Sequence, residues 1–410
     1  MESERAGARE PMEARPMSQY DVIVIGAGHN GLVTAAYLAK AGRRVLVLEK
    51  RPRVGGIAVT EELFPGFSFS TCAPEGCRLA SEVDEELQLA KQGLTWIAAD
   101  PVVFAPQPSG EELTIWRDPV RSAEEIGRFS AKDARRYPDF VATLSSLADV
   151  VGGLAKVVPP DLPALGLRDL RAMLPLAGPI RRLGRRRIND LLRVLPMPVA
   201  DLLNEWFESD VVKAAIAASA VRDITWGPKE AGTAYTLLFN WALSDTGLFR
   251  SAGIVKGGMG ALSGALANAV RAAGGEIRCS SPVEGLLLES GRVAGVSLVG
   301  GERIAAASVA SSADPRSTFF GICEPRLLPA DFVRHVRNVK YRGSTARVHL
   351  ALSGLPEFTA AGAGKAERLA GAIQIAPTIG YLQRAYDSTK YGQMSSVPHL
   401  DASIPTLHDP

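Results

Sequence analysis

The hydrophobic pattern first predicts a strand, a helix and a second strand near the N-terminus. Residues 20–25 (YDVIVI) form a short, apolar, β-branched run, which is typical of a strand buried on both faces. Helix-forming residues fill positions 32–41, and Gly42 follows where a helix would end. Residues 45–48 (VLVL) form a second apolar run. We therefore predict a parallel βαβ unit over residues 20–48.

A second patterned stretch begins near residue 253. Helix-forming residues lie between two glycine-rich turns, over positions 262–273. Three strand-like runs follow at 282–288, 293–298 and 303–306, and turn residues separate them. This pattern predicts a helix followed by a β-meander.

The middle and the end of the chain have a different pattern. Residues 76–250 lack the glycine-rich turns and contain helical runs, notably 200–220, so we predict a mostly helical substrate or cap domain. Alternating residues at 346–352 and 399–404 predict two strands that extend a sheet of the substrate domain.

Composition limits the classes of protein. The 410 residues exceed what one hydrophobic core usually supports, so two cores are expected. With 46 basic and 44 acidic residues and 46% hydrophobic residues, neither disorder nor a nucleic-acid-binding protein is indicated. No run of 18 apolar residues predicts a membrane span. Four cysteines fit a reducing compartment, so we expect an intracellular protein, cytoplasmic in a bacterium.

Residues 1–19 are predicted to be a flexible N-terminal tail. They mix glutamates with arginines and lack the apolar region of a secretory signal. The four glutamates also count against a mitochondrial transit peptide, which is poor in acidic residues. A later start, at Met12 or Met17, is a second interpretation.

The motif Gly26-Ala27-Gly28-His29-Asn30-Gly31 joins the first predicted strand to the helix. In a dinucleotide-binding loop Gly26 would make the tight turn, Gly28 would let the backbone approach a pyrophosphate, and Gly31 would allow close packing of helix and strand. The helix N-terminus would face the phosphates with its partial positive charge.

Glu49 completes the predicted dinucleotide site. It follows the second strand, where its carboxylate can accept hydrogen bonds from both ribose hydroxyls and would repel a 2′-phosphate. His29 lies inside the loop where the phosphates would bind, so we predict that it packs beside the pyrophosphate and is not a catalytic base.

The segment after Glu49 resembles the flavoprotein family of amine oxidases and phytoene desaturases. That family follows its ribose-binding Glu with a short basic segment and a Gly-Gly pair. The resemblance assigns Lys50, Arg53, Gly55 and Gly56 to an FAD site. It implies an α/β fold, namely a Rossmann-like FAD-binding domain of the GR2 type with an inserted α+β substrate domain.

The second patterned stretch is similar to another part of the same flavin domain. The family's Gly-Gly-Met-Gly turn, here 257–260, faces the substrate side, and its Pro-Val strand lies against the adenine. Val283 is therefore assigned to the FAD site. Residues 308–315 resemble the strand whose end returns toward the diphosphate.

Further short motifs place the chain in one subgroup of the family. They share an unusual combination of glycine, acidic and aromatic residues: Val59-Thr60-Glu61-Glu62, Pro65-Gly66-Phe67, Trp206-Phe207-Glu208-Ser209 and Lys256-Gly257-Gly258-Met259-Gly260. The predicted division is a tail (1–19), a first FAD-binding segment (20–75), a helical substrate or cap domain (76–250), a second FAD-binding segment (251–318) and a substrate-domain sheet with helices (319–410).

The resemblance also concerns the substrate and its source. Family proteins bury apolar substrates in a tunnel roofed by the insert, although aromatic residues at helical spacing are more often core residues. Six aromatic residues are candidates for such a tunnel: Trp206, Phe207, Trp226, Tyr235, Phe239 and Trp241. The arginine-rich stretch 168–193 is either a basic amphipathic helix on an anionic membrane surface or a solvated face, and Pro175 and Pro179 would break that helix.

The cysteines are interpreted as core residues. Disulphide reductases place a C-x4-C pair immediately after their Gly-Gly turn, whereas Cys72 and Cys77 come 16 residues or more beyond Gly56. That displacement moves the pair off the helix that would face a flavin, so a redox role is not predicted.

We predict an FAD-dependent oxidoreductase that transfers hydride from a small apolar or unknown organic substrate to the flavin. No residue is assigned as catalytic and no metal site is predicted. A carotenoid or retinoid isomerase or saturase, and a non-catalytic scaffold or regulator of mitochondrial function with a protein partner, stay open. The mitochondrial matrix is open by resemblance. The family's C-terminal Cys-Gly-x-Gly run is not found before Pro410, so a fragment or a loosely held flavin is expected.

Overall fold

The computed structural model describes residues 19–410 except 74–78, 158–165 and 361–365, and it leaves out most side chains between 167 and 183. The expected tail, 1–19, lies almost wholly outside these residues. The chain divides into two compact units. Unit 1 comprises Met1–Ala58, Glu85–Gly93 and Ser263–Val339, and unit 2 comprises Val59–Asp84, Leu94–Leu262 and Lys340–Pro410.

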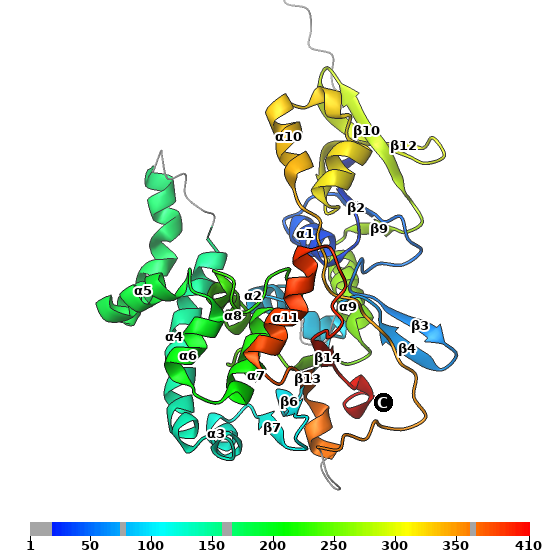
Figure 1. The fold of residues 1–410 in the computed structure, drawn as a ribbon. Helices are drawn as coiled ribbons and strands as arrows, with labels where there is room; N and C mark the ends of the chain where they lie inside the picture. Colours follow the sequence, from blue (N-terminus) through cyan, green and yellow to red (C-terminus); the bar gives the residue numbers. More distant parts are fainter. Residues whose placement is uncertain (1–18, 74–78, 158–165, 361–365) are drawn as a thin grey trace, which may run out of the picture. The chain divides into compact units, whose positions relative to one another are not determined.

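Unit 1 contains a six-stranded sheet in the order β10-β11-β12-β1-β2-β9 (Figure 1). Its strands are β1 (Tyr20–Ile25), β2 (Val45–Leu48), β9 (Glu276–Arg278), β10 (Val283–Glu289), β11 (Arg292–Leu298) and β12 (Arg303–Ser311). The four strands β12, β1, β2 and β9 run parallel, and β10, β11 and β12 form an antiparallel meander. The predicted strands at 20–25 and 45–48 and the predicted β-meander are confirmed.

Helix α1 (His29–Lys40) connects β1 to β2. Its buried residues include Leu32, Ala35 and Ala39, which share one face at helical spacing. The predicted helix began at residue 32, three residues late, because the polar His29 and Asn30 give no hydrophobic signal. Unit 1 also contains α10 (Ala330–Asn338), and α9 (Met259–Ala272) crosses the boundary between the units.

Unit 2 has a four-stranded sheet in the order β14-β13-β6-β7 and two strand pairs, β3 with β4 and β5 with β8. The strands are β3 (Thr60–Phe64), β4 (Phe67–Ser70), β5 (Trp96–Ala98), β6 (Val103–Pro106), β7 (Glu112–Ile115), β8 (Gly253–Val255), β13 (Ala372–Ile375) and β14 (Leu400–Ala402). The helices are α3 (Pro119–Gly127), α4 (Ala131–Ala155), α5 (Leu167–Val194), α6 (Val199–Trp206), α7 (Asp210–Ala220), α8 (Thr233–Ala242) and α11 (Ile379–Lys390), and α2 (Ser81–Glu86) lies at the boundary.

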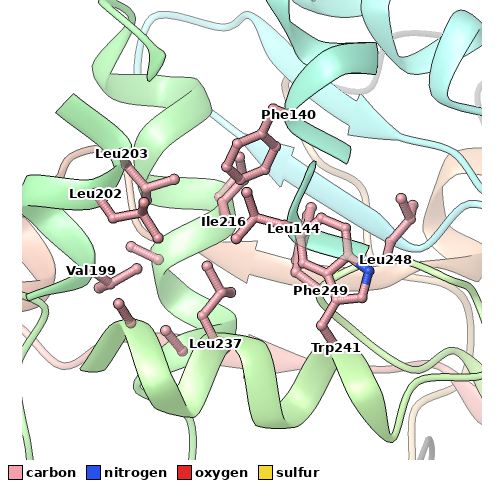
Figure 2. Packing of buried hydrophobic residues seen from close by; sticks show 14 of the residues in the cluster. Phe140, Leu144, Val199, Leu202, Leu203, Ile216, Leu237, Trp241, Leu248 and Phe249 are labelled. Atoms are coloured by element: carbon pink, nitrogen blue, oxygen red, sulfur yellow. The ribbon is translucent and has the colours of Figure 1, made fainter. Parts of the chain in front are cut away.

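The core of unit 2 forms where α4, α6, α7 and α8 pack together. Figure 2 shows side chains such as Leu144, Ile216 and Leu237 meeting there, and each is at most 1% exposed. Burying one such side chain contributes about 1.5–3 kcal/mol relative to its exposed state. The helical insert is therefore a hydrophobic domain in its own right.

The predicted helical run 200–220 is in fact two helices, α6 and α7, which are separated at Phe207. The cause is the buried carboxylate of Asp133, which accepts the backbone N–H groups of Glu208 (3.0 Å) and Ser209 (2.8 Å). These N–H groups lie at the start of α7 and would otherwise have no partner.

The six aromatic candidates for a tunnel do not share one environment. Phe207 and Trp241 are buried in the core of unit 2, and Trp206 and Phe239 pack against it. Trp226 and Tyr235 are 48% and 44% exposed. Core packing thus accounts for four of the six.

Two expectations about the backbone are wrong. Residues 346–352 have no strand structure, whereas the strand expected within 399–404 is β14. Helix α5 continues through Pro175 and Pro179 and loses helical geometry at Gly184, whose φ is 73° and ψ is 162°.

Contact of residues 168–193 with a membrane surface stays a prediction, because most side chains of the first half of α5 lie outside the described residues. Among the described helices, none combines the length and apolarity needed to cross a bilayer.

Candidate dinucleotide-binding site

The loop from Gly26 to Gly31 lies at the carboxyl end of β1, in the middle of the parallel strands of unit 1. Gly26 has a φ of 94°, and its N–H donates to the carbonyl oxygen of Leu48 (2.8 Å). The chain then turns into α1, whose first intrahelical bond runs from Leu32 N–H to the Gly28 oxygen. Ligands of open α/β sheets bind at this edge.

Two glycines of the loop are required by close packing. A Cβ at Gly31 would lie 2.0 Å from the Gly26 oxygen, and a Cβ at Gly26 would lie 2.5 Å from Ser312 Oγ. Real side chains do not approach so closely, so the helix can start this near to the strand only with glycine at both positions.

The second glycine pair meets the first loop directly. Gly55 N–H donates to the Ala27 oxygen (2.8 Å), and Gly28 and Gly55 form a parallel β-bridge. Gly56 has a φ of 60°, and a Cβ there would lie 3.0 Å from the Gly28 Cα. The chain thus brings together two glycine turns that are separated by a helix and a strand.

Gly28 differs from its neighbours because the space beside it is open. A Cβ at Gly28 would have only the Gly56 Cα within 4 Å, at 3.8 Å. Gly28 is the N-cap of α1, makes no side-chain cap, and no acidic residue occupies the first turn of the helix. The first N–H groups of α1 therefore lie beside an open position, which suits an anionic group.

Glu49 is buried (5% exposed) immediately after β2. Its Oε2 accepts Ala27 N–H (2.8 Å), and its Oε1 accepts Arg51 N–H (2.9 Å). These bonds fix the carboxylate at the glycine loop and leave lone pairs on each oxygen for further donors. A pair of ribose hydroxyls would be suitable donors.

Arg51 is a site residue that sequence reasoning missed. Its Nη1 donates to the Gly56 oxygen (3.1 Å), so it ties the second glycine pair to the end of β2. The sequence-based choices, Lys50 and Arg53, are both exposed. The basic character of residues 50–53 is visible in the sequence, but it does not indicate which side chain folds back.

Ser312 is the second missed residue. It follows β12, and its Oγ lies within hydrogen-bonding distance of the oxygens of Ile25 (3.0 Å) and Gly26 (3.1 Å). Residues 308–315 thus return to the glycine loop, as the family resemblance implied. A serine that follows a strand carries no signal of this contact in the sequence.

His29 and Val283 lie at two further places around the loop. Burial lowers the pKa of His29, the first residue of α1, so the neutral ring is favoured at neutral pH. Val283 begins β10, two residues after Ser281, whose N–H donates to the Glu49 oxygen (2.9 Å). Asn30 is exposed at the start of α1.

The residues of this loop fit a dinucleotide. They provide an uncapped helix start, an open position beside Gly28 and a buried carboxylate at the next strand. The cysteines play no part in it. Cys72 is a free, exposed thiol, so its interpretation as a core residue is wrong, and Cys77 lies outside the described residues. Within the described part of the chain, no three His, Cys, Asp or Glu side chains are grouped as metal ligands.

The fold and the loop define an α/β protein with a Rossmann-like nucleotide-binding domain. Two family descriptions match the sequence: an NAD(P)-binding Rossmann-like domain over residues 24–74 and a flavin containing amine oxidoreductase over residues 218–355.

The chain belongs to the amine oxidase and phytoene desaturase-like family of flavin-containing oxidoreductases. It is 33% identical to the rat (Rattus norvegicus) pyridine nucleotide-disulfide oxidoreductase domain-containing protein 2, and the match covers 96% of this chain and 71% of the rat protein. It is 32% identical to one of the polypeptides of limonene dehydrogenase from Castellaniella defragrans, over 74% of this chain and 53% of that polypeptide.

A solved structure of a putrescine oxidase variant has a similar fold. Its TM-score is 0.50 at 17% sequence identity, and the match covers 78% of this chain and 64% of the oxidase. This chain therefore spans about two thirds of the length of the proteins that it matches, and the similarity to the oxidase concerns the fold alone.

Proposed function

We propose that unit 1 binds FAD and that the protein is an FAD-dependent oxidoreductase. The observation that carries this proposal is the meeting of the two glycine turns beside the buried carboxylate of Glu49. Gly26, Ala27, Gly28, His29, Asn30 and Gly31 would surround the diphosphate, and Glu49 would bind the ribose. Lys50, Arg53, Gly55, Gly56 and Val283 would complete the site, with Arg51 holding Gly56 in place.

The proposed reaction is the removal of a hydride from a C–H bond of an organic substrate. Bound flavin supplies the hydride acceptor. The residues of this chain would position the cofactor and keep water from it, and no side chain is assigned as a catalytic acid or base. The names of limonene dehydrogenase and of 4,4′-diapophytoene desaturase support an apolar substrate, because each refers to the oxidation of such a molecule.

The first test is the visible absorbance spectrum of the purified chain, followed by release and quantification of the cofactor. FAD at near one per chain would support the proposal. A chain that neither carries flavin after purification nor takes it up from added FAD would contradict it and would favour a scaffold role. Screening of amine, hydroxy-acid and apolar alkene substrates for flavin reduction would then test the oxidoreductase function.

Gly28→Ala tests the site without disturbing the fold. Gly28 has a φ of −71° and a ψ of 169°, which alanine adopts freely, and the new methyl group would enter the open space beside the helix start. Because that space is where the pyrophosphate would lie, we expect FAD binding to weaken about tenfold or more. Fluorescence titration with FAD measures the effect.

The matched control is Gly264→Ala, in helix α9. A Cβ at this position has nothing within 4 Å, so FAD binding should be unchanged and the helix slightly more stable. Unchanged FAD affinity in Gly28→Ala would argue against the proposed position of the diphosphate. Gly31→Ala is unsuitable here, because its methyl group would collide with the Gly26 oxygen and disturb the fold itself.

A further inference from the structure

Unit 2 contains a cavity of about 80 Å³ that the proposed cofactor site does not use. A buried water needs roughly 10–15 Å³ on this measure, so the cavity can hold several waters or one small organic molecule. Its lining comes from sequence-distant parts of unit 2, including the chain after β5, the segment before β8, and the chain around β14.

Positive charge predominates in the lining. Arg222, Arg250 and Arg347 contribute three guanidinium groups, and Asp401 contributes the one carboxylate. Arg250 is 7% exposed and binds Asp401 through both terminal nitrogens, at 2.8 Å each. Arg222 Nε lies 3.4 Å from the same carboxylate and 3.6 Å from Asp223, which does not line the cavity.

The carboxylate of Asp401 is ionised in this environment. Burial raises its pKa, but the charge and hydrogen bonds of Arg250, together with the charge of Arg222, outweigh burial and hold the pKa at about 2. Asp401 and Asp223 therefore offset two of the three guanidinium charges.

Arg347 supplies the remaining positive charge. Among the residues that the structure describes, it makes neither an ion pair nor a hydrogen bond. Within the same part of the chain, the buried Nε of Arg250 also has no hydrogen-bond partner. The cavity thus retains one uncompensated guanidinium and one unused buried donor, which together match a single negative charge.

The rest of the lining is largely apolar. Val102, Ile254 and Ile404 line the cavity together with several alanines and prolines. An inorganic anion would leave these surfaces without a partner, whereas a short hydrocarbon chain would cover them.

We propose that this cavity is a binding site for a small organic monocarboxylate, held by Arg347 and Arg250 and packed against the apolar wall. The site lies within unit 2 and does not depend on FAD. It therefore goes beyond the proposed function, and either proposal can fail without the other.

The test is a ligand-observed NMR titration of the full 410-residue chain with butyrate, at constant ionic strength. Butyramide has nearly the same shape without the charge, and inorganic phosphate has the charge without the hydrocarbon chain. We expect butyrate to bind at least about tenfold more tightly than either, the difference that one charge-assisted hydrogen bond makes. Equal binding of butyramide, tighter binding of phosphate, or no binding of butyrate would each overturn the proposal.

Arg347→Met removes the uncompensated charge. Because Arg347 is exposed, the fold should be kept, and butyrate binding should weaken about tenfold. Arg342→Met is the matched control, since Arg342 is exposed in the same segment and does not line the cavity. Butyrate should bind this variant as it binds the wild type.

Arg347→Lys provides a second variant, which keeps the charge but loses the forked geometry of the guanidinium. It should bind butyrate more weakly than the wild type and more tightly than Arg347→Met. Equal weakening by Arg342→Met and Arg347→Met would show a general effect of charge and would overturn the assignment to this cavity.

Discussion

At the scale of single residues, Glu49 connects the parts of the glycine-rich site. Its two carboxylate oxygens accept the N–H groups of Ala27 and Arg51, and its own carbonyl accepts Ser281 N–H. Arg51 in turn holds Gly56. One buried side chain therefore fixes the loop after β1, the turn after β2 and the approach to β10.

Glu49→Gln should destabilise unit 1. An amide offers one oxygen and one NH2 group, so either Ala27 N–H or Arg51 N–H would face a donor in place of an acceptor. A buried N–H without an acceptor costs about 1–3 kcal/mol, and we expect the free energy of unfolding to fall by this amount. Urea-induced unfolding measures it.

Glu284→Gln is the control for this change, because Glu284 is an exposed glutamate in the same sheet. Its substitution should change the unfolding free energy by less than about 0.5 kcal/mol. Equal effects of the two substitutions would contradict the structural role of the Glu49 carboxylate.

The glycine loop could be predicted from the sequence because each of its tasks is local. Gly26, Gly28 and Gly31 lie within six residues, between a strand and a helix that the pattern itself shows. Arg51 and Ser312 could not be predicted in the same way. The contact of Ser312 with Gly26 joins residues 286 positions apart, and only the folded sheet brings them together.

At the scale of elements, strand β14 is tied to the segment before β8 by the ion pair between Asp401 and Arg250. The Asp401 side chain is 20% exposed, and its pKa is about 2, compared with about 3.9 for an aspartate in an unfolded chain. Because the folded-state pKa is the lower one, the pair stabilises the protein fully above about pH 4 and loses this effect as the pH falls toward 2.

The stability difference between the wild type and Asp401→Asn should therefore depend on pH. We expect this difference to be about 1 kcal/mol smaller at pH 3 than at pH 6, since part of the wild-type advantage is lost on protonation. Urea unfolding of both proteins at the two pH values measures the change. A difference that stays constant would mean that the folded-state pKa of Asp401 is not lowered.

The elements that were predicted wrongly depend on distant partners. Residues 346–352 alternate like a strand, yet no neighbouring strand pairs with them in the described structure, so the pattern alone was misleading. The break between α6 and α7 depends on Asp133, which lies more than 70 residues before it. By contrast β1, β2 and the meander carry their own signals in apolar runs and turn glycines.

At the scale of the whole molecule, each unit has its own hydrophobic core, and all proposed FAD ligands belong to unit 1. Leu237→Ala removes a fully buried side chain from the core of unit 2, which should cost about 2–5 kcal/mol. We expect a lower midpoint of thermal unfolding, while FAD affinity below that midpoint stays unchanged. Calorimetry and FAD titration measure the two quantities.

Leu243→Ala is the control for this prediction, because Leu243 follows the same helix and is 51% exposed. It should leave both quantities nearly unchanged. Loss of FAD binding in the folded Leu237→Ala variant would mean that the cofactor site depends on the packing of unit 2.

The path of the chain through unit 1 has a consequence for synthesis on the ribosome. β1 can pair with β2 soon after both emerge, but its other neighbour, β12, ends with Ser311. At roughly 5–20 residues per second, translation from one partner to the other takes about 15–60 s. During that time one edge of an apolar strand has no partner in the nascent chain, and such an edge invites pairing with other chains. Chaperones that cover nascent β1 should therefore affect the yield of this protein more than its final stability.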